Sequence, residues 1–417
     1  MKWRALCSPV PPGLICLAIA AVSVLPAVYD LWKVVTIAAG QLDGPAAGTD
    51  FLNLYTGASL FAHEPGSTYQ LDTQQLLQRS LTGRESPLVP FYLPPYAALL
   101  VSWLGWLPYG PAYVLWLVVN VVCLMLAIFL AAPRWTRWYV FVWLGLVMPF
   151  LPVVLGLGQG QTSALLLLAS AGLVRGFTSA TRSSISRVTC VVGWLLKPQL
   201  GVMLMVVLVL TRSWRILAGT LVAVAALGTA ALIRLGQAGI ASYVRVSQQK
   251  TLEVFTADPT FLIGPTLLHA SHWLLGVNAV AHLVAAVLAS ATIATTVYVW
   301  RHGVATDESL LLKLAILPIA SVIAAPYALI YELMPWLVSF WLLWDYTALR
   351  PSARAVLLWL VAGVWISANI GVGEPRAGGA DVAAILGLCF VAYIAGLSYY
   401  SEHRDLDGTS ARQSICG

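Results

Sequence analysis

The chain has 417 residues, of which 59% are hydrophobic and only 10% are charged. Soluble proteins carry about 25% charged residues, so this composition excludes an ordinary soluble enzyme and a disordered chain. The formal net charge is +6 at pH 7, but the basic residues fall in short clusters between long apolar runs. Such clusters set membrane topology, and we expect no nucleic-acid partner. The sequence predicts an all-α, polytopic protein with the lipid bilayer as a partner.

Long apolar stretches recur along the chain, and each approaches the roughly 20 residues that a helix needs to cross a bilayer. They are residues 13–37, 111–132, 139–156, 161–175, 216–235, 279–300, 309–325, 327–344, 355–371 and 382–400. The first run continues past the length of a signal peptide, so we expect an uncleaved span. We predict about 10–12 transmembrane helices in one domain over residues 1–400, with a polar cytoplasmic tail at 401–417.

Placing the basic N-terminus and every short basic cluster inside leaves two polar segments outside. The first, residues 38–90, is the longest hydrophilic stretch and has a helical pattern from Asp72 to Leu81. The second, residues 236–262, carries Arg245 and Lys250. This topology predicts a multi-pass protein of the plasma (inner) membrane with its active site facing the periplasm or the outside.

One short segment between two inside clusters does not fit two full crossings. Residues 188–211 number only 24, whereas two crossings need about 40. Lys197-Pro198 stands in the middle, and a proline breaks or kinks a helix. We favour two half-helices that enter the membrane and return, with Lys197 near the tip, over a single kinked span. For residues 91–107 and 261–276 we likewise expect interfacial or re-entrant helices.

Charge within the apolar stretches is the most informative anomaly. An ionised side chain at the bilayer centre costs about 2.5–3.5 kcal/mol even on insertion scales, so it usually marks a function. Lys197 is a lone cation there, and lysine binds phosphate as a point charge; a lipid phosphate is the natural ligand at membrane depth. Arg245 could add to the same field or be a solvated charge. Asp30 and Glu332 could each face water, and Glu332 could also pair with a basic residue.

Two polar motifs could act on a sugar substrate. Asp50 follows the first span closely, and a carboxylate there could take a proton from an acceptor hydroxyl or simply cap a helix. The run from Gly156 to Gln161 lacks the order of a dinucleotide-binding motif. The amides of Gln159 and Gln161 suit sugar hydroxyls, although the run could also be a tight turn that opens the next helix.

These motifs together resemble glycosyltransferase family 87, polytopic transferases of the GT-C superfamily that use polyprenyl-phosphate sugars. The resemblance covers about residues 48–345 in the family's order. It rests on Asp50 to Tyr55 with Tyr69, Tyr92-Leu93-Pro94-Pro95-Tyr96, Gly160-Gln161, Leu196-Lys197-Pro198 with Trp214-Arg215, and Ala325-Pro326-Tyr327 leading to Tyr331-Glu332-Leu333. It implies a GT-C-like fold, Asp50 as general base of an inverting displacement, Lys197 near the donor phosphate and residues 326–332 near the sugar. The family's last segment often begins Ser-Pro and carries Asp or His, where this chain has Ala325 and Glu332.

We therefore expect a glycosyltransferase that moves a hexose from a polyprenyl-phosphate donor to a glycolipid or glycan acceptor. Mannose is the common case in the family, and arabinofuranose is its rival. The candidate residues are Asp50 for catalysis, Lys197 and Arg245 for the donor phosphate, and Tyr55, Tyr92, Gln159, Gln161, Tyr327 and Glu332 for the sugar or acceptor. Stabilising the anionic leaving group needs no metal in principle, and we expect no cofactor. The alternative, a transporter or flippase of an anionic lipid or solute, favours inverted repeats, which the sequence does not show.

Overall fold

The structure is a computed structural model that describes residues 49–83, 88–131, 147, 150–178, 183–256, 264–302, 307–369 and 379–413. Within these ranges every regular element is a helix, which confirms the all-α class. The span expected at 13–37 and Asp30 lie outside the described residues, as does most of the span expected at 139–156.

The helices follow one another with short connections. They are α2 (Thr49–His63), α3 (Leu71–Thr82), α4 (Pro95–Val101), α5 (Tyr109–Ala131), α7 (Leu151–Gly158), α8 (Ser163–Thr178), α9 (Ser184–Trp194), α10 (Pro198–Leu210), α11 (Trp214–Thr256), α12 (Leu267–Leu275), α13 (Ala279–Arg301), α14 (Asp307–Ile323), α15 (Trp336–Tyr346), α16 (Pro351–Asn369) and α17 (Gly379–Gln413). Three short 3-10 helices join them: η1 (Pro65–Ser67), η2 (Ser102–Trp106) and η3 (Ile330–Leu333).

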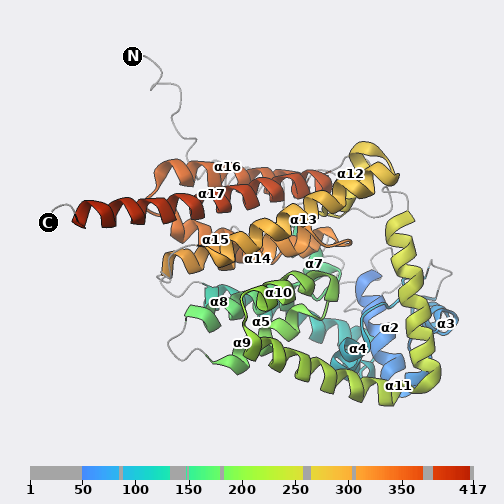
Figure 1. Cartoon of the computed structure of the whole chain (residues 1–417). Helices are drawn as coiled ribbons and strands as arrows, with labels where there is room; N and C mark the ends of the chain where they lie inside the picture. The colour runs from blue at the N-terminus through green and yellow to red at the C-terminus, as the bar shows by residue number, and fades with distance from the viewer. Residues whose placement is uncertain are drawn as a thin grey trace.

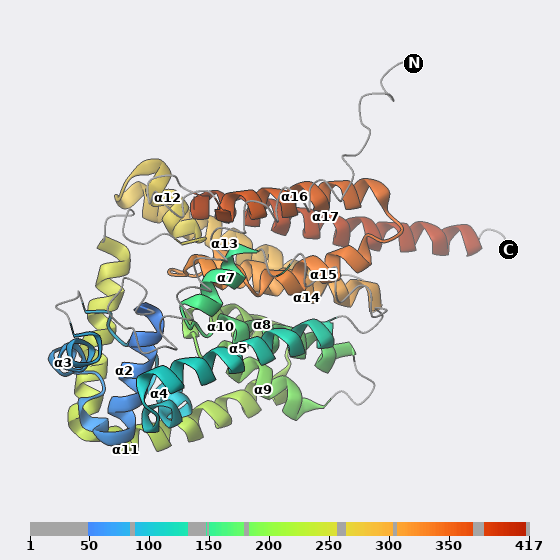
Figure 2. The same cartoon turned by 180° about the vertical axis from the view of Figure 1, so that it is seen from behind.

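The helices form two layers and a lateral lobe (Figures 1 and 2). One layer holds α12 to α17, the other holds α5, α8, α9, α10 and the first part of α11, and α7 lies between them. The lobe consists of α2, α3, α4 and the second part of α11. One apolar core joins the layers, since it contains Trp194 of α9 together with Trp336 and Trp341 of α15.

Five helices are long and apolar enough to cross a membrane: α5, α11, α13, α16 and α17. This establishes a multi-pass membrane protein, with fewer long helices in the described ranges than expected. The segments predicted as spans at 309–325 and 327–344 fall on α14 and α15, which have 17 and 11 residues. At 1.5 Å per residue these helices are about 26 and 17 Å long, shorter than a hydrocarbon core of about 30 Å.

The expected break at Lys197-Pro198 separates α9 from α10, and the two helices form a hairpin. Arg187 at the start of α9 donates to the carbonyl of Gly176 at 2.9 Å. The neighbouring Phe177 ring contacts Trp300 at the end of α13, and Arg301 donates to the carbonyl of Leu210 at 3.4 Å. The start of α9 and the end of α10 therefore lie at the same end of the molecule, and the single kinked span is wrong.

The long helix α11 bends at Gly236. Its φ of 64° and ψ of −177° are not helical, and this left-handed φ favours glycine. The segment expected as an outer loop at 236–262 is therefore helical as far as Thr256. Positions 243, 247, 250 and 254 are three or four residues apart, and this spacing places them on one helix face.

The other short segments agree with their predicted lengths. The helix predicted from Asp72 to Leu81 is α3. Residues 91–107 contain α4 and η2, with seven and five residues, and residues 261–276 contain the nine-residue α12. Each is too short to cross a bilayer, as an interfacial or re-entrant helix should be.

Candidate active site

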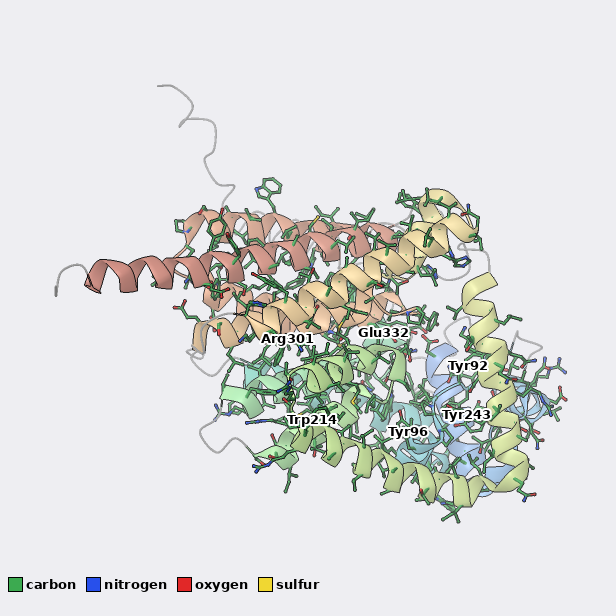
Figure 3. The ribbon with its side chains drawn as sticks, viewed as in Figure 1. Tyr92, Tyr96, Trp214, Tyr243, Arg301 and Glu332 are labelled. Carbon is green, nitrogen blue, oxygen red and sulfur yellow. The ribbon has the colours of Figure 1, made fainter. Side chains whose placement is uncertain are left out.

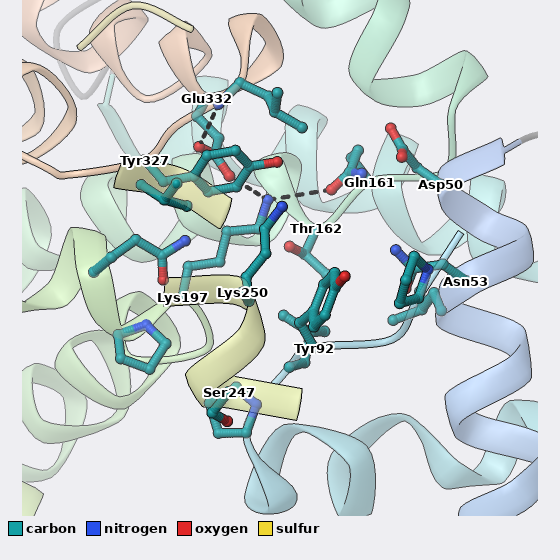
Figure 4. A pocket seen from close by; sticks show the side chains of 18 of the residues that line it. Asp50, Asn53, Tyr92, Gln161, Thr162, Lys197, Ser247, Lys250, Tyr327 and Glu332 are labelled. Carbon is teal, nitrogen blue, oxygen red and sulfur yellow. Dashed lines mark hydrogen bonds and ion pairs between the residues drawn. The ribbon is translucent and has the colours of Figure 1, made fainter. Parts of the chain in front are cut away.

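A cavity of about 440 Å³ lies where the lobe meets the two layers (Figure 4). Its size falls within the range of small-molecule sites, roughly 300–1,000 Å³. The start of α2, the α7–α8 turn, the α9–α10 tip, the second part of α11 and η3 all contribute. Its polar lining consists of Asp50, Asn53, Tyr92, Gln161, Thr162, Lys197, Gln199, Tyr243, Ser247, Lys250, Thr251, Glu253, Tyr327, Tyr331 and Glu332. The expected base and the expected phosphate cation thus face one chamber.

The expectation of a lone buried cation is wrong, because Lys197 has a carboxylate partner. Its ammonium forms an ion pair with Glu332, and the two residues are only 6% and 1% exposed. Lys197 also donates to Gln161 Oε1 at 3.2 Å, and the backbone N–H of Leu329 donates to Glu332 Oε2 at 2.8 Å. Breaking such a pair from one side typically costs about 3–5 kcal/mol. Each charge therefore holds the other in place.

Tyr331 connects this pair to Asp50. The Lys197 ammonium lies 5.2 Å from the centre of the Tyr331 ring. The phenol of Tyr331 donates a hydrogen bond to the half-buried carboxylate of Asp50. Burial, followed by the charge of Asp50, raises the pKa of Tyr331 well above its usual value, so the phenol keeps its proton at neutral pH. Asp50 lies in the first turn of α2, which begins at Thr49.

Tight packing at Gly160 places Asp50 beside Gln161. Gly160 has a φ of +66°, and a Cβ there would lie 2.7 Å from the Cβ of Phe51. Its carbonyl accepts a hydrogen bond from the Trp116 indole at 2.7 Å. The run from Gly156 to Gln161 is thus a turn that opens α8, and the same turn presents Gln161 to the cavity. Both alternatives for this run hold at Gln161.

Two buried glutamines hold the extended segment that leads to Tyr92. Gln78 of α3 donates to the Val89 carbonyl at 2.7 Å and accepts from the Val89 N–H at 3.0 Å. One turn earlier, Gln74 accepts from the N–H of Phe91 at 2.8 Å. These amides replace the partners that a neighbouring strand would give to extended backbone. The i, i+4 glutamine pair was a usable sequence signal that we did not interpret.

The aromatic residues around Pro94-Pro95 have different roles. Tyr92 lines the cavity, and burial followed by the charge of Glu253 raises its pKa to about 12. Tyr96 instead donates a hydrogen bond to the carbonyl of Leu195. That contact anchors the α9–α10 tip, two residues before Lys197, to α4.

The opposite wall carries Lys250, which the sequence analysis treated only as a polar-segment charge. Its ammonium lies 5.1 Å from the centre of the Tyr92 ring and 4.8 Å from that of Tyr327. Its carboxylate partner is Glu253, at 3.4 Å, and the two side chains are 20% and 46% exposed. The helical spacing of Tyr243, Ser247 and Lys250 could have identified this wall if the segment had been interpreted as a helix.

The structure does not bring three of the expected residues to the cavity. Tyr55 is buried, donates to the Leu107 carbonyl at 2.8 Å and packs edge-on against Tyr109. Arg245 is exposed on α11 and is absent from the cavity lining, as is Gln159 at the end of α7. Figure 4 shows where the other expected residues, Asp50, Tyr92, Gln161, Lys197, Tyr327 and Glu332, lie.

The arrangement combines a carboxylate with cations, phenols and amides in one chamber. A carboxylate can take a proton from a hydroxyl, and ammonium groups can bind an anionic oxygen. Amides and phenols can donate to or accept from sugar hydroxyls. Across the described ranges, no three His, Cys, Asp or Glu side chains gather closely enough to hold a metal ion. The chamber thus suits a polyhydroxyl ligand that carries an anionic group.

Comparison with known families gave one match. The model for glycosyltransferase family 87 matches residues 91–326. This range contains Tyr92, Gln161, Lys197 and Lys250, whereas Asp50 and Glu332 lie outside it. No curated protein and no solved structure matched the chain.

Proposed function

Because the chain belongs to glycosyltransferase family 87 and is a multi-pass membrane glycosyltransferase, we propose that it transfers a hexose from a polyprenyl-phosphate donor. Mannose is the sugar that we propose, and a glycolipid or glycan is the acceptor. The single observation that carries this proposal is the shared chamber, in which the Asp50 carboxylate and the Lys197 ammonium line the same cavity. Family membership removes the reason to prefer a transporter.

The proposed reaction is one displacement at the anomeric carbon. Asp50 takes the proton of the acceptor hydroxyl while the acceptor oxygen forms a bond to that carbon. The bond from the carbon to the donor phosphate oxygen breaks on the opposite face, and the configuration inverts. Tyr331, which donates to Asp50, orients the carboxylate and must leave one of its lone pairs for the acceptor.

The leaving group explains why the chamber needs cations. The donor phosphate is a diester with one negative charge, and the released polyprenyl phosphate is a monoester that gains a further charge. Positive groups already aimed at that oxygen stabilise the transition state more than the ground state. We assign this task to the lysine side of the chamber, and the sugar hydroxyls to Tyr92, Gln161, Tyr327 and Glu332.

The distribution of basic turns supports an outward-facing site in the plasma membrane. Arg187, Arg301 and Leu210 lie together at the open end of the α9–α10 hairpin, away from Lys197 at its tip. Arg350 pairs with Glu308 at the start of α14, which follows Arg301 in the chain. Figure 3 shows Arg301 on one side of the molecule and Tyr92 and Tyr243 on the other. Basic turns face the cytoplasm, so the cavity would open to the other side.

A transfer assay with purified protein tests the proposal. Radiolabelled polyprenyl-phosphate mannose and polyprenyl-phosphate arabinofuranose are each incubated with a mixture of glycolipid acceptors. We expect wild-type protein to transfer mannose and Asp50→Asn to lose about 10²–10⁴-fold in rate. Asp72→Asn is the matched control, because Asp72 is an exposed carboxylate of α3 outside the cavity. Equal rates for Asp50→Asn and wild type would remove Asp50 from the mechanism.

The same assay tests the expectation that no metal is needed. We expect transfer to continue in EDTA at its original rate. Loss of transfer in EDTA, with recovery on addition of Mg²⁺ or Mn²⁺, would overturn that expectation.

A further inference from the structure

We infer that Lys250, and not Lys197, is the cation that binds the donor phosphate. The inference rests on the proposed function, because it concerns the same polyprenyl-phosphate donor. It names a residue that the sequence analysis left among polar-segment charges and that lies on the α11 side of the cavity.

The charge of Lys197 is already committed inside the protein. Glu332 neutralises it in a pair that is almost fully buried, and Gln161 accepts a second hydrogen bond from it. If a phosphate replaced Glu332, that carboxylate would stay buried without its cation, which is strongly unfavourable. Lys197 is therefore a structural cation that orders the hairpin tip, η3 and Gln161.

The charge of Lys250 is available for exchange. Its only printed carboxylate contact is with Glu253 on the next turn, at 3.4 Å, and 46% of the Glu253 side chain is exposed. Exposed pairs of this spacing contribute little to stability, so Glu253 can return to water when another anion takes its place. The rings of Tyr92 and Tyr327 meanwhile keep the ammonium at the cavity wall through cation–π contacts.

The surroundings of Lys250 also suit a phosphate that carries a lipid. Tyr327 and Val254 line the cavity and pack in one apolar cluster with Leu268 of α12 and Ala285 of α13. Beyond this cluster, apolar side chains are exposed on the same helices, among them Leu274 at 60% and Leu283 at 65%. A polyprenyl chain can follow this apolar surface while its phosphate meets Lys250 at the wall.

Glu253 gives the inference a sign that a purely structural lysine would not have. Glu253 competes with the donor phosphate for Lys250 and repels its charge. Removing the Glu253 charge should therefore strengthen donor binding, whereas removing the Lys250 charge should weaken it. Two neighbouring variants should thus shift the same constant in opposite directions.

The experiment measures the KM for a farnesyl-phosphate mannose donor and the Ki of farnesyl phosphate as a competitive inhibitor. Farnesyl phosphate has no sugar, so its Ki reports the phosphate and lipid contacts alone. For Lys250→Met we expect both constants to rise at least tenfold, and for Lys250→Arg to stay within threefold of wild type. For Glu253→Gln we expect both to fall severalfold. Arg245→Met removes the same charge from the same helix outside the cavity, and we expect less than a twofold change.

Failure of this inference differs from failure of the proposed function. If wild-type protein transfers sugar and folded Lys250→Met keeps both constants within twofold, Lys250 does not bind the phosphate. Equal effects of Arg245→Met and Lys250→Met would also overturn the inference, since they would indicate a general surface field. If Lys250→Met does not fold, Glu253→Gln decides, because an unchanged or higher Ki contradicts the inference. Absence of transfer by wild type from any polyprenyl-phosphate donor overturns the proposed function itself.

Discussion

The two lysine walls of the cavity hold the same kind of charge in different ways. At the α9–α10 tip, Lys197 lies beside Glu332 in the protein interior, and neither side chain has more than 8% of its surface exposed. On α11, Lys250 lies between two aromatic rings and has only an exposed carboxylate nearby. Burying an ionised group requires a fixed partner, whereas a half-exposed one can change partners. The tip wall is thus suited to position groups, and the α11 wall is suited to bind a ligand that comes and goes.

The largest expected effect comes from breaking the tip pair. Lys197→Met leaves Glu332 charged and buried, and we expect it to lower the free energy of unfolding by about 3–5 kcal/mol. The double variant Lys197→Met/Glu332→Gln removes both charges and should recover most of that loss. Thermal or denaturant unfolding in detergent measures this difference. Equal stability of the single and double variants would show that the pair does not behave as a buried one.

The second prediction concerns the turn that joins the tip wall to Asp50. Gly160→Ala forces an alanine to a φ of +66° and its Cβ against Phe51, which costs about 1–2 kcal/mol from the backbone alone. We expect a lower unfolding midpoint and a lower kcat, because α2 and Asp50 must shift. The control is Gly228→Ala in α11, where nothing lies within 4 Å of the added carbon. A kcat that is equal in both variants would separate this turn from the positioning of Asp50.

The third prediction concerns the segment that supports the α11 wall. Gln78→Ala leaves the N–H and carbonyl of Val89 without their side-chain partner, at a cost of about 1–3 kcal/mol. Because this segment leads to Tyr92, we expect the donor KM to rise severalfold more than kcat falls. Gln75→Ala on the same helix is the matched control, with an expected change within about 0.5 kcal/mol. If kcat alone fell, Gln78 would act on the chemical step and not on binding.

The smallest expected effect is a pH dependence of the helix behind the α11 wall. Burial, followed by the charge of His272, lowers the pKa of His269 in α12 to about 4. The neutral ring therefore stabilises the fold above about pH 6.5, and this contribution is lost as pH falls toward 4. Between pH 7 and 5.5 we expect a loss of about 1 kcal/mol, measured as a lower unfolding midpoint. His269→Gln should flatten this dependence, whereas His302→Gln, at an exposed position, should leave it unchanged.

Local sequence patterns predicted the helix-breaking and positioning elements well. Pro198 predicted the end of one helix and the start of another, because a proline acts on its own turn. The glycine-rich run before Thr162 predicted the turn that presents Gln161. The second part of α11 was missed for a related reason. Its polar residues suggested a solvated segment, but the chain bends at Gly236 and turns that polar face toward a cavity.

By itself the sequence determined the membrane class, the all-α fold and the breaks between helices, because apolar run length and proline placement act within a few residues. It also identified Asp50 and Lys197 as charges that need an explanation. Only the tertiary structure decided how these charges are satisfied. Lys197 and Glu332 are 135 residues apart, and Asp50 reaches Tyr331 across a similar separation. Such contacts depend on how the two layers pack, which no local pattern encodes.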